Sequence, residues 1–196
     1  GVGSATHLSS AAQGFGAVRQ SPDGQWLVLM RLDSSSPDIV GLHTGDTAIV
    51  PLVATPASET GPQLSPDGKW LAYASDESGT FEVYVRPFPN TSSARWQVSA
   101  SGGTAPLWAH SGKELFFHTK QGELASVQVS TTPGFSVSTA RTLFSAKPFR
   151  FSPQTQTYDI SPDDKQFLMM RETATGEAGQ LVVSEHWLDD IESRKQ

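Results

Sequence analysis

Five histidines are the side chains of this chain best suited to metal binding or proton transfer. No two of them have the spacing of a zinc-binding His-Glu-x-x-His motif. His110 and His118 could approach each other across one hairpin, which leaves metal binding open as an alternative. We favour a structural interpretation, because turns and strands commonly carry such polar residues. The five are His7, His43, His110, His118 and His186.

Acidic residues occur in three adjacent pairs, Asp76-Glu77, Asp163-Asp164 and Asp189-Asp190. A calcium loop needs several spaced oxygen ligands that converge on one point, and no such loop is present in the sequence. We interpret the pairs as turn formers and solvated charges. The sequence therefore predicts no metal site and no cofactor.

The sequence also contains no motif for covalent catalysis. The Gly-x-Ser-x-Gly elbow that presents a nucleophilic serine in α/β-hydrolases is absent, and so are the glycine-rich loop and the catalytic motifs of protein kinases. We expect no catalytic residue and no enzyme activity within these residues. Three tryptophans, Trp70, Trp96 and Trp108, could form an aromatic platform for a ligand, but we favour packing in the core for them.

One short segment recurs along the chain and organises everything else. It begins at residues 21, 65, 109 and 161, which gives spacings of 44, 44 and 52 residues. Periods of this length with strand-like content are typical of propeller blades, each of which buries its apolar faces only against its neighbours. The copies are Ser21-Pro22-Asp23-Gly24, Ser65-Pro66-Asp67-Gly68, Ala109-His110-Ser111-Gly112 and Ser161-Pro162-Asp163-Asp164.

The residue types of this segment predict a tight turn between two strands. Proline presets φ, Ser and Asp bond nearby backbone groups, and glycine accepts the positive φ that ends the turn. The third copy keeps Gly112 but has lost proline, whereas the fourth has Asp164 in place of glycine. Asp tolerates left-handed backbone better than most residues, so we expect this turn to survive. The structural turn residues are Pro22, Asp23, Gly24, Pro66, Asp67, Gly68, Gly112, Pro162, Asp163 and Asp164.

Short apolar runs after each turn read as buried strands, and a period-two strand follows at 81–86. We predict an all-β chain, a β-propeller of TolB-like or WD-like repeats with four blades, as part of a ring of six or more. The expected organisation is a blade remnant or linker at 1–14, blades at about 15–58, 59–102, 103–157 and 158–184, and a short helix or tail at 185–196.

Composition limits the alternatives. The net charge of −6 and the lack of a basic stripe argue against nucleic-acid binding. The chain has no cysteine, which excludes disulfides and thiolate metal sites. No apolar run is long enough to predict a membrane-spanning segment.

The stretch Leu64 to Pro89, with its Ser-Pro-Asp-Gly turn and its Glu-Val-Tyr-Val-Arg-Pro-Phe-Pro run, resembles TolB-like propellers. It is similar to the C-terminal sensor propeller of bacterial receptor-type serine/threonine kinases. The resemblance implies a non-catalytic module that binds a protein, peptide or small ligand, in an extracytoplasmic or periplasmic location. The alternative is a gating propeller of a prolyl-oligopeptidase-like serine peptidase, whose catalytic domain lies outside this chain.

Ligands of propellers normally bind at one rim of the central channel. The innermost strand of each blade should precede its turn, which predicts binding residues on those strands. Glu82 and Arg86 project from the same face of one strand, so we also expect them to pair, a contact worth little if it is exposed. With four blades only, the terminal blades should expose apolar faces and allow self-association. The candidate binding residues are Glu59, Thr60, Gln63, Thr104, Tyr158 and Arg86.

Overall fold

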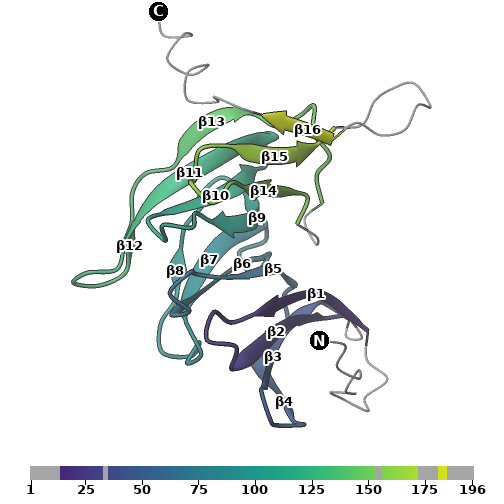
Figure 1. Cartoon of the computed structure of the whole chain (residues 1–196). Coiled ribbons are helices and arrows are strands. Elements are labelled where there is room, and N and C mark those ends of the chain that lie inside the picture. Colours follow the sequence, from purple (N-terminus) through teal and green to yellow (C-terminus); the bar gives the residue numbers. More distant parts are fainter. Residues whose placement is uncertain (1–13, 33–34, 153–155, 172–180, 185–196) are drawn as a thin grey trace, which may run out of the picture.

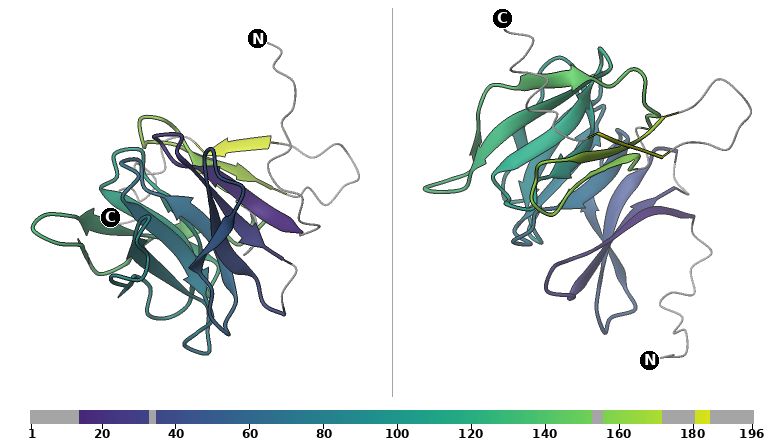
Figure 2. Two further views of the ribbon diagram at one scale, coloured as in Figure 1. Left: turned by 90° about the horizontal axis from the view of Figure 1, so that it is seen from below. Right: turned by 45° about the horizontal axis from the view of Figure 1, so that its top comes forward.

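Strand-forming runs separated by tight turns fold into four antiparallel sheets. Within each sheet, strands that follow one another along the chain lie side by side, except at one edge of the third sheet. The computed structural model describes residues 14–32, 35–152, 156–171 and the strand at 181–184. The predicted remnant at 1–14, apart from Gly14, and the predicted helix at 185–196 lie outside the described residues. Figures 1 and 2 show the four sheets side by side in chain order, as the blades of a propeller are.

Blades 1 and 2 have four strands each, whereas blade 3 has five and blade 4 has three. Blade 1 consists of β1 (Phe15–Gln20), β2 (Trp26–Arg31), β3 (Asp38–His43) and β4 (Ile49–Val53). Blade 2 consists of β5 (Glu59–Leu64), β6 (Trp70–Ser75), β7 (Glu82–Pro87) and β8 (Trp96–Gln97). Blade 3 consists of β9 (Gly103–Trp108), β10 (Glu114–Thr119), β11 (Glu123–Ser130), β12 (Ser136–Val137) and β13 (Arg141–Ser145). Blade 4 consists of β14 (Tyr158–Ile160), β15 (Phe167–Met170) and β16 (Leu181–Ser184).

The repeated segment forms the turn between the first two strands of each blade. In blade 2 the Ser65 hydroxyl donates to the Asp67 carboxylate at 2.5 Å and accepts from the Trp70 backbone N–H at 3.0 Å. The same two bonds recur around Ser21 and Ser161. Gly24, Gly68 and Gly112 have φ of 70°, 68° and 68°, and Asp164 has φ of 60°. The predicted positive φ at the last turn position is therefore confirmed in all four copies.

The core lies between the blades, in three layers. Leu71 and Tyr73 of β6 pack toward blade 1, whereas Ala72 between them packs toward blade 3. On β10, Leu115 and Phe117 pack toward blade 2, and Phe116 packs toward blade 4. The second strands of blades 2 and 3 therefore have a buried partner on both faces, which explains why these two segments read as continuous apolar runs.

The expected ion pair between Glu82 and Arg86 does not form. Both residues are on β7, but Glu82 is buried and accepts from the Gly102 N–H and the Ser99 hydroxyl. Arg86 donates instead to the Tyr73 hydroxyl at 2.7 Å and to the Thr91 carbonyl at 2.9 Å. The prediction was wrong because residues four apart along an extended strand are separated by about 13 Å, so each charged group bonds to partners at its own end of β7.

Large apolar side chains are exposed on both terminal blades. Leu168 and Met170 alternate on β15 with the buried Phe167 and Met169, so they lie on the face that points away from blade 3. In blade 1, Val18 is 52% exposed. No further described blade covers either face.

Candidate functional site

A pocket of about 450 Å³ opens at the end of blade 3 that is opposite its turn. Strand β10 leaves the turn next to Trp108, and its far end pairs with the first residues of β9, Thr119 with Gly103 and His118 with Thr104. The same end of blade 2 and the connection into blade 4 complete the walls. We call this cavity the blade 3 pocket. Its lining residues are Thr80, Phe81, Gly102, Gly103, Thr104, His118, Thr119, Lys120, Gly122, Ala146, Lys147, Phe149 and Phe151.

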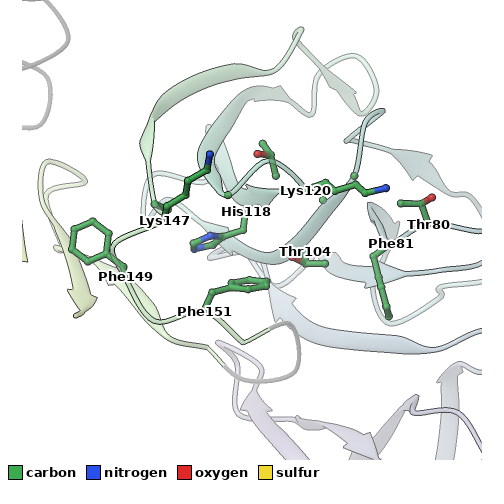
Figure 3. A pocket seen from close by; sticks show the side chains of 13 residues that line it. Thr80, Phe81, Thr104, His118, Lys120, Lys147, Phe149 and Phe151 are labelled. Carbon is green, nitrogen blue, oxygen red and sulfur yellow. The ribbon is translucent and has the colours of Figure 1, made fainter. Parts of the chain in front are cut away.

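Two lysines stand on opposite sides of the blade 3 pocket, and glycines make room for both. A Cβ atom at Gly102 would lie 2.6 Å from the Cβ of Lys120, and one at Gly122 would lie 2.9 Å from the Cγ of Lys147. Both glycines also have positive φ, 93° and 79°, so other residues would be strained there. Figure 3 shows Lys147 near His118 and the two phenylalanines, and Lys120 toward Thr80 and Phe81.

His118 forms part of the wall between these lysines. It is 3% exposed, and its ring lies 4.7 Å from that of Phe151 and 5.0 Å from that of Tyr158. Its Nε2 atom is buried without a hydrogen-bond partner among the described residues. Burial lowers the pKa of His118 to about 4, so the imidazole is neutral at pH 7. It therefore adds an uncharged ring, and no cation, to the wall.

The charge of the blade 3 pocket is therefore positive. Its lining includes Lys120 and Lys147 but no Asp or Glu. Glu82 does not line the pocket, and its carboxylate accepts a hydrogen bond from the N–H of the lining residue Gly102 at 2.9 Å. This local charge contrasts with the net charge of −6 of the whole chain.

A bulge near the start of β9 shapes the floor of the blade 3 pocket. The register of β9 and β10 shifts between Phe116 and His118, and Ala105 at this point has φ of 49°. The Tyr158 hydroxyl of blade 4 donates to the Ala105 carbonyl at 2.8 Å and holds the strained residue in place. Gly61 has the matching position in β5, with φ of 61° and a similar register shift. β-Bulges of this kind change the direction in which side chains point, and they are common next to active sites.

Of the predicted binding residues, Thr104 alone lines the blade 3 pocket. Glu59 is fully buried, with its carboxylate held by the Thr55 hydroxyl at 2.5 Å, and burial raises its pKa. Thr60 is also buried, with an unpaired hydroxyl. Tyr158 is buried, and burial raises its pKa well above the ordinary value. Arg86 is bound to Tyr73, away from the pocket.

Gln63 makes a contact between blades that are distant in sequence. Its side-chain amide donates to the Gln156 side chain at 3.0 Å, from β5 to the segment before β14. Arg19 on β1 interacts electrostatically with Asp159 on β14, although burial lowers the pKa of the guanidinium. Innermost strands of blades 1, 2 and 4 thus contribute polar groups toward a shared centre. These contacts are internal to the propeller and leave the blade 3 pocket as the candidate site.

The other residues considered from the sequence have structural surroundings. Trp70 packs edge-on against Trp96 at 5.6 Å, Phe135 packs against both, and Trp108 is buried in the same layer. The ring of His110 lies 3.2 Å from Asp164 rather than near His118. In the part of the chain that the structure describes, no three His, Asp or Glu side chains are grouped closely enough to bind a metal. No helix among the described residues is long and apolar enough to cross a membrane.

Sequence reasoning missed most of the pocket. Lys120, Lys147, Phe149 and Phe151 have no special spacing, because they come from a hairpin and from the connection between two blades. The available signals were the Gly102-Gly103 pair and the unusual length of the third repeat. Each of these features marks a place where blade 3 differs from the regular repeat, and residues from both places line the blade 3 pocket.

The radial blades, the repeated turns and a pocket at the opposite end define a β-propeller domain. The chain belongs to the TolB beta propeller domain family, whose model matches residues 2–185. No curated protein sequence matches it.

Solved structures share this fold at low sequence identity. TolB from Acinetobacter baumannii is 14% identical with a TM-score of 0.66, over 91% of this chain and 42% of that one. A puromycin-hydrolyzing peptidase from Mycobacterium tuberculosis is 20% identical with a TM-score of 0.61, over 89% and 30%. An auxiliary nutrient binding protein from Bacteroides thetaiotaomicron is 11% identical with a TM-score of 0.55, over 79% and 42%. The chain therefore spans less than half of each.

Proposed function

We propose that this chain is a non-catalytic binding module within a larger protein, and that it binds its ligand in the blade 3 pocket. The observation that carries the proposal is the pocket itself: about 450 Å³, open on the end of the blades opposite the turns, and lined by two blades and a connection. Cavities of this size with apolar walls and a few polar groups are typical of ligand sites. No group of catalytic side chains accompanies it among the described residues.

A filled-pocket variant tests this proposal. Thr104→Trp places an indole inside the blade 3 pocket, and Thr131→Trp makes the same change at an exposed position beside the turns. Ligands from a library of metabolites and short peptides should raise the melting temperature of the wild type and of Thr131→Trp but not of Thr104→Trp. Equal stabilisation of all three would place binding elsewhere and contradict the proposal. Should Thr104→Trp not fold, Thr80→Trp at the exposed rim replaces it.

The absence of catalysis is tested separately. We expect no turnover of ATP, of a peptide ester or of a nucleic acid by the isolated chain. Activity that persists through purification to homogeneity would contradict the non-catalytic role.

For the parent protein we favour a receptor-type serine/threonine kinase, with the propeller as its sensor outside the cytoplasm. The support is the resemblance of Leu64 to Pro89 to such sensor propellers. This resemblance leaves a protein, a peptide or a small molecule open as the ligand. The gene sequence before Gly1 should encode kinase motifs followed by a membrane-spanning helix.

The second candidate is the gating propeller of a serine peptidase. The observation in its favour is the shared fold with the puromycin-hydrolyzing peptidase, at a TM-score of 0.61. An α/β-hydrolase segment with a Gly-x-Ser-x-Gly elbow in the same gene would establish it and exclude the kinase.

A further inference from the structure

We infer that the blade 3 pocket takes a small ligand with one anionic group on an aromatic or alkyl body. The inference rests on the proposed function and deepens it by naming the ligand class. It follows from three features of the wall: its apolar surface, its two lysines and its neutral histidine.

The apolar body follows from the aromatic residues. Phe149 and Phe151 lie on one side of the blade 3 pocket, and Phe81 lies on the other (Figure 3). Phe151 is 44% exposed, an unusual position for so large an apolar side chain. Its ring is supported from behind by His118. A flat or flexible apolar group that enters the pocket would cover this surface.

The anionic group follows from the charges. Lys120 and Lys147 line the blade 3 pocket, and neither ammonium group has an ion-pair or hydrogen-bond partner among the residues that the structure describes. The stems of both lysines are seated against glycines, which limits how far they can turn away. Two carboxylates close to the wall already accept hydrogen bonds, Glu82 from Gly102 and Ser99, and Glu123, next to Gly122, from Thr142. A ligand anion would be attracted by Lys120 on one side of the pocket and by Lys147 on the other.

The size of the site favours a small molecule over a folded partner. The pocket holds about 450 Å³, whereas a protein partner would need a wide apolar surface around it. Because His118 is uncharged, we expect the part of the ligand that lies against its ring to be uncharged too. A cationic ligand is excluded, since it would meet like charge on both sides.

Two fluorescent probes test this ligand class. Anilinonaphthalene sulfonate and phenylnaphthylamine share one aromatic skeleton, and only the first carries a negative charge. We expect the sulfonate to bind the wild type about tenfold more tightly than the neutral probe, and Thr104→Trp to weaken it strongly. Titrations with direct excitation of the probe avoid energy transfer from the new tryptophan.

Charge variants test the role of the lysines. Lys120→Gln and Lys147→Gln should each weaken the sulfonate probe about three- to fivefold, and the double variant about tenfold, without effect on the neutral probe. The matched control is Lys113→Gln with Lys165→Gln, which removes the same two charges beside the turns, where both lysines are exposed. Higher salt should reduce the difference between the probes.

The outcomes separate the two proposals. If both probes bind equally, are blocked by Thr104→Trp and ignore the lysine variants, the anionic class is wrong and the binding function stands. If Thr104→Trp or its replacement Thr80→Trp changes neither probe, no ligand enters the blade 3 pocket, and both proposals fail. If the control variants weaken the sulfonate as much as the pocket variants, the attraction is a general surface effect and the inference is overturned.

Discussion

The two turns that depart from the repeat should be energetically coupled. Asp164, at the glycine position of the fourth turn, accepts from the backbone N–H groups of His110 at 2.7 Å and Ser111 at 3.0 Å in the third turn. His110 stands where the other copies have proline, which has no N–H to donate. Partial burial acts to raise the pKa of Asp164, but the N–H groups of Ser111 and His110 outweigh it, so the pKa lies below its ordinary value.

The regular turns show the alternative arrangement. A Cβ at Gly68 would lie 3.3 Å from the Cδ of Pro22, and one at Gly112 would lie 3.8 Å from the Cδ of Pro66. In these pairs the proline of one blade packs over the glycine of the next. Between blades 3 and 4, hydrogen bonds to a carboxylate replace that packing. The two departures therefore compensate each other.

A double-mutant cycle with His110→Pro and Asp164→Gly measures this compensation. Asp164→Gly loses two hydrogen bonds worth about 0.5–1.5 kcal/mol each and relieves about 1 kcal/mol of strain at φ of 60°, so we expect a net loss of about 1 kcal/mol. His110→Pro removes one donor and sets its ring against Asp164, at a similar cost. The double variant restores the regular pair of residues and should be close to the wild type in stability.

Urea titrations followed by tryptophan fluorescence can check the cycle. Each single variant should lower the unfolding midpoint by about 0.5 M, with a coupling energy of about 1–2 kcal/mol between them. A pair on turns that do not pack against each other, such as Pro22→Ala with Gly112→Ala, should show no such coupling. If the two effects add within about 0.3 kcal/mol, the proposed link between the turns is refuted.

Three further predictions concern the turn and two buried ionisable groups, His118 and Glu59. Gly68→Val should lower the melting temperature more than Pro66→Ala, because Gly68 has φ of 68° whereas loss of the proline costs under about 1 kcal/mol; equal shifts would contradict this. Burial lowers the pKa of His118 to about 4, so between pH 6.5 and 4 the imidazole is protonated in the unfolded chain but not in the folded chain. The free energy of unfolding should therefore fall by up to about 3 kcal/mol as pH drops from about 6.5 to 4. His118→Gln should flatten this part of the stability profile, and an unchanged slope would assign it to other groups. Burial raises the pKa of Glu59, so the sign is opposite: the stability that this group contributes is lost as pH rises from the ordinary glutamate value through the raised one. Glu59→Gln should remove that loss in urea titrations across pH.

Much of the fold could be predicted from the sequence because its signals are local. Ser, Pro, Asp and Gly act within one turn, and the apolar runs after them need only a buried strand on either side. The positive φ at Gly24, Gly68, Gly112 and Asp164 follows from turn chemistry alone. The sheets, their order and the packing of Trp70 and Trp108 in the core were accessible in the same way.

Only the tertiary structure shows the contacts between blades, because these contacts join residues that are far apart in the sequence and belong to different turns and strands. Asp164 reaches a turn 54 residues earlier in the chain, and each of the two departures appeared independent in the sequence. Lys120 and Lys147 belong to a hairpin and to a connection, and only the packing of blade 3 against its neighbours brings them to one cavity. Thr104 lines the cavity beside a bulge in β9, and the residue type of Thr104 does not predict that bulge. Turn geometry is set by a few adjacent residues, whereas a pocket depends on where whole blades meet.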